Sequence, residues 1–96
     1  MTEYNKLLAN HLRQFIWINR KLIHVDLSYT NLSEGIIYKL IPAIRKGKTL
    51  MSIHLSGNPG ATDMVKQYAK VTLKCKPQVM SFDGLDIEQV LKKNNY

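Results

Sequence analysis

The sequence predicts an α/β fold: a short repeat solenoid with parallel β-strands on its concave side and α-helices on its outer side. The first observation is an internal repeat, because LIHVDLSYTNL at 22–32 is echoed by LMSIHLSGNPG at 50–60, 28 positions later. The second is the alternation of apolar and polar residues in each copy, which is typical of a strand with one wet face. The third is an amphipathic segment between the copies, which is typical of a helix. Such units cannot bury their apolar faces alone, so the copies are expected to stack.

The repeat frame also predicts how the chain is organised. We expect one domain over residues 1–96, because this length suits a single core. An N-terminal helix with a partial repeat is expected at 1–21, and two clear repeats at 22–49 and 50–77. A degenerate repeat with a C-terminal helix is expected at 78–96.

The first predicted element is an amphipathic helix over residues 2–18, which starts after Thr2. Its apolar residues recur at helical spacing and are expected to face the interior: Tyr4, Leu7, Leu8, Leu12, Phe15, Ile16 and Ile18. Trp17 lies near the same apolar edge and is expected to pack with them. A strand follows at 22–28, where apolar residues at every second position should point inward.

Ser33 and Glu34 open a second helix, which is predicted to run to about Arg45. Pro42 lies inside this helix, and we expect it to kink the helix because proline lacks an amide and clashes with the preceding turn, at about 3 kcal/mol. Gly47 then suits a left-handed helix cap.

The second repeat predicts a strand at 52–56, a helix at 61–75, a third strand at 79–82 and a last helix at 86–93. The helix at 61–75 is expected to bury one apolar side: Met64, Val65, Tyr68, Ala69, Val71 and Leu73. Cys75 at its end is expected to be a small buried residue, and a single cysteine cannot form an internal disulfide.

The turns after the first two strands hold polar residues at equivalent positions, Thr30 and Asn58. We expect both side chains to turn inward and to hydrogen-bond buried backbone groups, each of which would cost about 1–3 kcal/mol if left unpaired. The turn 57–60 reads Gly-Asn-Pro-Gly and lacks the lysine and hydroxyl residue of a phosphate-binding loop, so it is interpreted as a turn only.

These features resemble the ribonuclease-inhibitor-like subfamily of leucine-rich repeats. The resemblance rests on the 28-residue spacing within 22–60, on the bridge Leu32-Ser33-Glu34-Gly35, and on the leucine frame that continues through Leu40, Ile44 and Leu50. It implies a curved parallel sheet lined by helices and a role in protein recognition in the cytosol or nucleus. Related scaffolds serve the actin and ciliary cytoskeleton, innate sensing and nuclease inhibition.

The predicted function is a non-enzymatic protein–protein interaction or scaffold module within a larger intracellular assembly. The resemblance implies a cytoplasmic location, with a cytoskeletal or ciliary setting. Two alternatives stay open: a basic adaptor for nucleic acid or a ribonucleoprotein, and a regulatory subunit of an enzyme. Because repeat units normally need at least three copies for stability, the chain is expected to belong to a larger complex or a longer chain.

Charge indicates the kind of partner. The net charge is +7, and between Ile36 and Phe82 there are eight lysines or arginines but a single acid, Asp63. Such a field favours a protein partner with an acidic surface, and nucleic acid less so, since no nucleic-acid motif accompanies the charge. No apolar stretch approaches the roughly 20 residues of a membrane span. No cofactor motif or metal-ligand spacing is present, so neither is predicted.

Two groups of residues are the candidate partner-binding sites. The first is the predicted concave face and the turn beside it: His24, Asp26, Ser28, Tyr29, Ser52, His54 and Ser56. The second is a basic stripe of residues spaced four apart on one helix: Lys66, Lys70 and Lys74. Asp26, Ser28 and His54 have the residue types of a hydrolytic triad, but an open sheet offers no pocket or oxyanion donors, so no catalytic residue and no enzyme are predicted.

Overall fold

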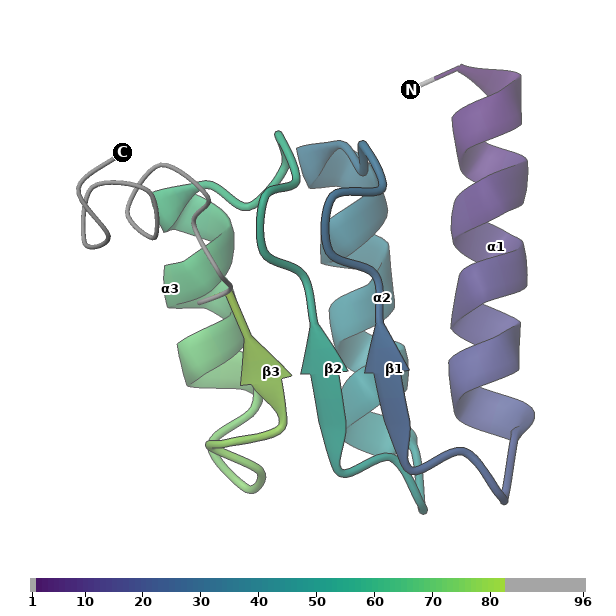
Figure 1. The fold of residues 1–96 in the computed structure, drawn as a ribbon, viewed down its shortest axis with the longest axis vertical. Helices are drawn as coiled ribbons and strands as arrows, with labels where there is room; N and C mark the ends of the chain where they lie inside the picture. Colours follow the sequence, from purple (N-terminus) through teal and green to yellow (C-terminus); the bar gives the residue numbers. More distant parts are fainter. Residues whose placement is uncertain (1, 83–96) are drawn as a thin grey trace, which may run out of the picture.

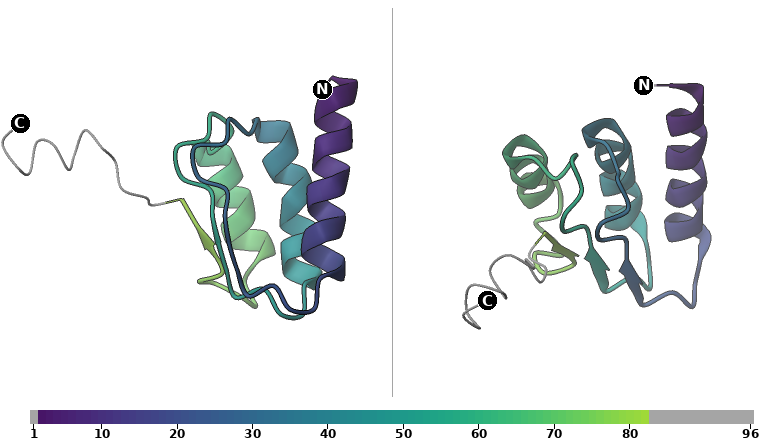
Figure 2. Two further views of the ribbon diagram at one scale, coloured as in Figure 1. Left: turned by 45° about the vertical axis from the view of Figure 1, so that its right-hand side comes forward. Right: turned by 45° about the horizontal axis from the view of Figure 1, so that its top comes forward.

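The computed structural model describes residues 2–82, in which helices cover one face of a parallel sheet (Figure 1). The elements, in chain order, are α1 Glu3–Ile18, β1 His24–Asp26, α2 Glu34–Lys46, β2 Ser52–His54, α3 Asp63–Thr72 and β3 Met80–Ser81. The strands lie in the order β1-β2-β3, and both neighbouring pairs are parallel. The three helices form one layer and the strands form the other, as the turned views in Figure 2 show.

The prediction of a short repeat solenoid, with a concave sheet and an outer ring of helices, is wrong. The described residues instead form a small compact α/β unit with three helices and one three-stranded parallel sheet. The physical reason is the number of copies, because a solenoid needs at least three stacked repeats and only two copies here keep the full pattern. The third strand has shrunk to the two residues Met80–Ser81. The element order was nevertheless predicted correctly from residue 2 to residue 82, while the predicted helix at 86–93 lies outside the described residues.

Each helix begins at a hydroxyl side chain that caps it. The side chains of Thr2, Ser33 and Thr62 accept hydrogen bonds from the backbone N–H three residues later. An acidic residue follows each cap directly, which suits the positive end of the helix dipole. The Thr62 hydroxyl also donates to Glu34 Oε2 at 2.6 Å. This bond ties the start of α3 to the start of α2.

The core lies between the two layers and is dominated by α2 and β2. Ile53 and Leu55 are fully buried, as predicted, whereas Val25 and Leu27 of the edge strand are only partly covered. The largest fully buried side chains come from all three helices and from the central strand: Ile16, Ile36, Ile37, Leu40, Ile41, Ile44, Ile53, Leu55 and Val65. The middle elements are buried most because each has a neighbour on both sides.

Pro42 does not end α2, and the predicted left-handed cap at Gly47 is wrong. The helix runs on through Pro42 to Lys46. Pro42 is exposed, so the hydrogen bond that it cannot donate is lost on the outer side of the helix. Gly47 ends the helix with φ −60° and ψ 135°, which is extended and not left-handed.

Several apolar residues that were expected inside are exposed. On α3 these are Met64 and Val71, and Tyr68 is only partly covered by an edge-to-face contact with Tyr38 at 5.1 Å. Cys75 is exposed as well. The expected inward faces of α1 and α3 are therefore wider than the faces that the fold buries.

Left-handed backbone occurs at matching places in the two copies. Tyr29 has φ 58° and Gly57 has φ 70°, and Asn31 also has a positive φ of 60°. Glycine adopts this conformation without penalty, whereas a tyrosine does so at a cost. The Tyr29 ring lies directly over Gly57, where it occupies the space that a side chain at position 57 would need.

Asn58 turns inward as predicted and joins the two copies. Its Oδ1 accepts from the backbone N–H groups of Thr30 at 3.1 Å and Leu32 at 2.9 Å. Its Nδ2 donates to the carbonyls of Leu27 at 2.9 Å and Leu55 at 3.0 Å. Thr30 does less, because it is exposed and its hydroxyl donates to the Leu27 carbonyl at 2.7 Å within its own turn.

Candidate partner-binding surfaces

The face of the sheet opposite the helices carries polar side chains in a defined register. His24 pairs with Ser52, and Asp26 pairs with His54. The register predicted from the 28-residue offset is therefore confirmed. With only three strands there is no concave groove, and these side chains stand on a short open surface.

Ser52 links the two histidines of this face. His24 Nδ1 lies 3.1 Å from Ser52 Oγ, and the same oxygen lies 3.3 Å from His54 Nε2. The two rings are also close, with centroids 4.8 Å apart. A hydroxyl can donate to one nitrogen and accept from another, so Ser52 can bridge one nitrogen of each ring. Within residues 2–82 no group of three histidine, cysteine or acidic side chains could hold a metal ion.

Asp26 is held by its own turn. The Ser28 backbone N–H donates to Asp26 Oδ1 at 2.9 Å. This bond, followed by the Ser28 side-chain hydrogen bond, lowers the pKa of Asp26, and the nearby His54 and His24 add smaller effects in the same direction. The carboxylate therefore stays ionised and forms a local negative spot beside two histidines.

The two turn residues of this predicted site differ in accessibility. Ser56 is only 3% exposed, so its placement on the exposed face is wrong, and its Oγ has no hydrogen-bond partner in the described part of the chain. The alternation stops there because the chain leaves β2 after His54 and bends into the turn at Gly57. Tyr29 is exposed beside Gly57. The accessible members of the predicted set are thus His24, Asp26, Ser28, Tyr29, Ser52 and His54.

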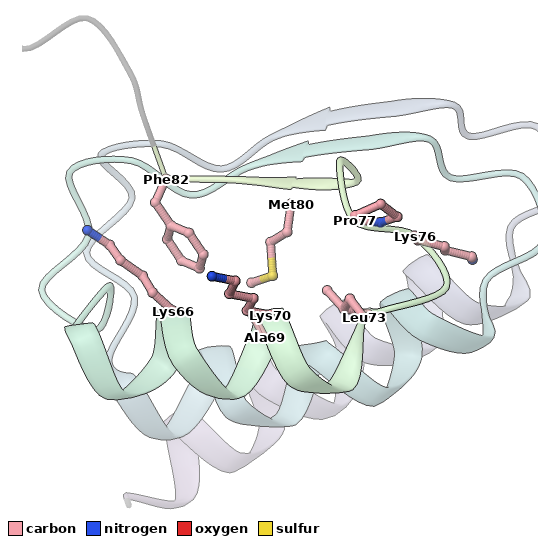
Figure 3. Close-up of a pocket in the computed structure, with 8 residues that line it drawn as sticks. All are labelled: Lys66, Ala69, Lys70, Leu73, Lys76, Pro77, Met80 and Phe82. Atoms are coloured by element: carbon pink, nitrogen blue, oxygen red, sulfur yellow. The ribbon is translucent and has the colours of Figure 1, made fainter.

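A second candidate is a pocket of about 240 Å³ between α3 and β3 (Figure 3). Two of the three predicted stripe lysines line it, and so does a lysine from the loop before β3. The lining residues are Lys66, Ala69, Lys70, Leu73, Lys76, Pro77, Met80 and Phe82. The prediction that Lys74 shares this helix is wrong, because α3 ends at Thr72, and Lys74 does not line the pocket.

Sequence reasoning missed this pocket because two of its walls come from the weakest element of the repeat. Met80 of β3 and Phe82 just after it point toward α3, as Figure 3 shows. The alternation in Val79-Met80-Ser81-Phe82 is the signal that could have found them, since residues 80 and 82 must share one face of a strand.

Lys76 has a structural task in this region. Its ammonium group donates to the carbonyl of Ile44 at 3.1 Å and to the carbonyl of Gly47. Both carbonyls lie at the C-terminal end of α2, where a cation interacts favourably with the helix dipole. Lys76 therefore fastens the loop before β3 to the end of α2.

We expect Lys76→Met to lower the free energy of unfolding by about 1–2 kcal/mol, because it removes two charge-assisted hydrogen bonds from a partly buried site. Chemical denaturation of the full chain measures the change. Lys74→Met is the matched control: this lysine is exposed, has no hydrogen-bond or ion-pair partner within residues 2–82, and its loss should change stability by less than about 0.5 kcal/mol. Equal effects of the two substitutions would show that Lys76 does not fasten the loop.

A third candidate is the side of α1 that faces away from α2. Four large apolar side chains are exposed there: Tyr4, Leu7, Phe15 and Ile18, with exposures of 72%, 56%, 50% and 68%. Together with His11 they follow spacings of three and four residues, so they form one stripe. We call this set the outer face of α1. The opposite side of α1, which faces the core, carries Ala9 and Ile16.

The outer face of α1 is also hollowed. A shallow depression of about 360 Å³ is lined by His11, Gln14, Phe15, Ile18 and Asn19. Trp17 lies elsewhere on the helix and is 54% exposed, with the Lys46 ammonium 5.7 Å from its ring centre. The predictions that Tyr4, Leu7, Phe15, Ile18 and Trp17 pack inside are therefore wrong.

Comparison of this chain with protein-family models, with curated proteins and with solved structures finds no match. The resemblance to leucine-rich repeats consequently has no support beyond the residues that suggested it. Across residues 2–82, no helix combines the length and the apolar character needed to cross a bilayer.

Proposed function

We propose that this protein is a non-enzymatic module for protein–protein interaction within a larger assembly. The observation that carries the proposal is the outer face of α1. Monomeric domains rarely expose contiguous apolar patches, and larger ones mark sites where another protein binds. Four large apolar side chains lie on one helix stripe with His11 between them, each half or more exposed, and completing their burial against a partner would contribute up to about 1.5–3 kcal/mol each.

The partner is expected to be largely apolar where it meets α1. Phe15 and Ile18 supply the apolar lining of the depression, and Gln14 is a polar residue of the same lining that can hydrogen-bond a partner. Asn19 Oδ1 already accepts from the backbone N–H groups of Lys21 and Leu22. Apolar residues combined with polar ones are typical of protein interfaces. The intracellular location stays a prediction, as does the cytoskeletal or ciliary setting.

The test compares two double variants of the full chain in native extract of cells that produce it. Leu7→Glu with Phe15→Glu places charge on the outer face of α1. Met64→Glu with Val71→Glu is the matched control, because both residues are exposed and apolar on α3. We expect the wild type and the control to elute in a large complex and the α1 variant to elute at the size of the free chain.

Thermal unfolding of the purified variants separates loss of binding from loss of fold. Both variants should keep the wild-type stability within about 1 kcal/mol, because the exchanged side chains are exposed. A wild type that elutes free in extract, or an α1 variant that stays in the complex, would contradict the proposal.

The alternative of a basic adaptor for nucleic acid has one observation in its favour. The only ion pair in residues 2–82 joins Lys6 and Glu3, so the lysines of α3 are not neutralised there. Binding through phosphates would weaken steeply with salt. Tight, steeply salt-dependent binding of an oligonucleotide that the α1 variant keeps would favour this alternative. No described residue specifically favours the third alternative, a regulatory subunit of an enzyme.

A further inference from the structure

We propose that the pocket between α3 and β3 is a separate binding site for an acidic peptide segment of a partner protein, which inserts one aliphatic side chain between carboxylates that meet Lys66 and Lys70. The site lies at the opposite end of the layers from α1 (Figure 1). It goes beyond the proposed function and does not depend on it.

The interior of the pocket suits an apolar side chain. Ala69 on α3 and Leu73 at its C-terminal cap form the base, and Met80 of β3 and Phe82 just after β3 approach from above them (Figure 3). Apart from the Phe82 ring these walls are aliphatic. The volume of about 240 Å³ is below the usual range for drug-sized ligands, about 300–1,000 Å³, and fits a single large side chain.

The rim of the pocket suits carboxylates. Lys66 and Lys70 stand one helical turn apart on α3, and Lys66 Nζ lies 5.8 Å from the centre of the Phe82 ring. Lys76 is already committed to the carbonyls of Ile44 and Gly47. Lys70 has no ion pair or hydrogen bond in the described part of the chain. Two lysines are therefore available to an anion.

A peptide fits better than a compact anion because the pocket opens into a second hollow. That hollow measures about 390 Å³ and shares Lys66, Pro77, Met80 and Phe82 with the first, while Gln78 and Ser81 extend it along β3. An extended backbone can therefore continue past the inserted side chain. Nucleic acid is disfavoured, because single strands bind on several aromatic platforms and this site holds one ring, already faced by Lys66.

The experiment uses the full chain and a short fluorescein-labelled peptide in which one leucine is flanked on both sides by aspartates. Fluorescence anisotropy measures its Kd. We expect the double variant Lys66→Ala and Lys70→Ala to raise Kd about tenfold, equivalent to about 1.4 kcal/mol. Lys74→Ala is the matched control: it removes the same charge from the exposed turn just after α3, outside the pocket, and we expect a change below about twofold.

Two further probes test the two halves of the recognition. A peptide with serine in place of leucine should bind about tenfold more weakly, and so should one with asparagines in place of the aspartates. Equal weakening by Lys74→Ala, or equal binding of the serine peptide, would reduce the effect to general charge attraction and overturn the proposal. Absence of binding would overturn it too.

Two other occupants are distinguished in the same assay. If a single-stranded oligonucleotide displaces the peptide and binds more tightly in a Lys66- and Lys70-dependent way, the site serves nucleic acid. If the peptide binds only after Asp83→Asn, Asp86→Asn and Glu88→Gln, the natural occupant is this chain's own acidic segment. Either result would overturn the assignment to a partner. None of these outcomes depends on the outer face of α1, so the two proposals can fail separately.

Discussion

Asn58→Ala should lower the free energy of unfolding by about 4 kcal/mol, a large part of the roughly 5–15 kcal/mol that keeps a domain folded. The Asn58 side chain is 6% exposed; it accepts hydrogen bonds from two backbone N–H groups and donates to two backbone carbonyls. Alanine would leave the buried Leu32 N–H and Leu55 carbonyl without this partner, at about 1–3 kcal/mol each, and would remove a hydrogen bond from the Thr30 N–H. The Leu27 carbonyl would keep the Thr30 hydroxyl as a donor. The measurement is urea denaturation of the full chain followed by far-UV circular dichroism.

Ser56→Ala is the control for this prediction. Ser56 is as buried as Asn58 and close to it in the chain, but its hydroxyl has no partner within residues 2–82. Its removal should leave stability unchanged or slightly raise it, because a buried polar atom without a hydrogen bond is unfavourable. Similar losses in the two variants would show that the Asn58 network is not what joins the copies.

Gly60→Ala is the second large effect that we expect, with a loss of about 3 kcal/mol or more. The Gly60 N–H donates to the Leu32 carbonyl at 2.8 Å, which brings the second turn against the start of α2. A methyl group at Gly60 would overlap the backbone of Ser33 and Glu34. Backbone at a capped helix start cannot move aside cheaply, so the two copies would have to separate. Differential scanning calorimetry of the variant would show the drop in Tm.

Gly47→Ala provides the contrast for Gly60. An added methyl at Gly47 would meet the carbonyl oxygen of Ala43 at 3.4 Å, an ordinary contact, and its φ of −60° suits any residue. We therefore expect a change within about 0.5 kcal/mol. If Gly60→Ala were equally mild, the close approach at the start of α2 would be absent in solution.

The arrangement of the strands was readable from the sequence because it follows from a repeated pattern. Matching leucines at one offset predicted that Val25 lies beside Ile53, and parallel pairing at that register is what the structure shows. Asn58 was equally readable, since a polar residue at an inward position must find partners. Local periodicity carries this information because equivalent residues in two copies meet equivalent neighbours.

The extent of the fold and its binding surfaces were not readable in the same way. An apolar stripe on α1 predicts that a helix packs, but it does not state how many neighbours the helix has. In the structure α1 packs on α2 through Ala9 and Ile16, and Phe15 remains at the surface. The pocket could not be predicted for a related reason. Its walls come from two segments separated by a turn, with Lys66 and Lys70 on one and Met80 and Phe82 on the other, and no sequence spacing relates the two.

The contact of the Tyr29 ring with Gly57 makes the two left-handed turns interdependent. While an aromatic ring occupies that space, position 57 admits only glycine, because any β-carbon there would fall within the ring. A smaller residue at 29 would lift the steric half of that restriction and leave only the backbone penalty at φ 70°. Because the Tyr29 ring is 57% exposed, it can turn outward, so a side chain at position 57 comes at the cost of this contact and of the backbone penalty. The two turns are therefore coupled, and a substitution in one changes what the other tolerates.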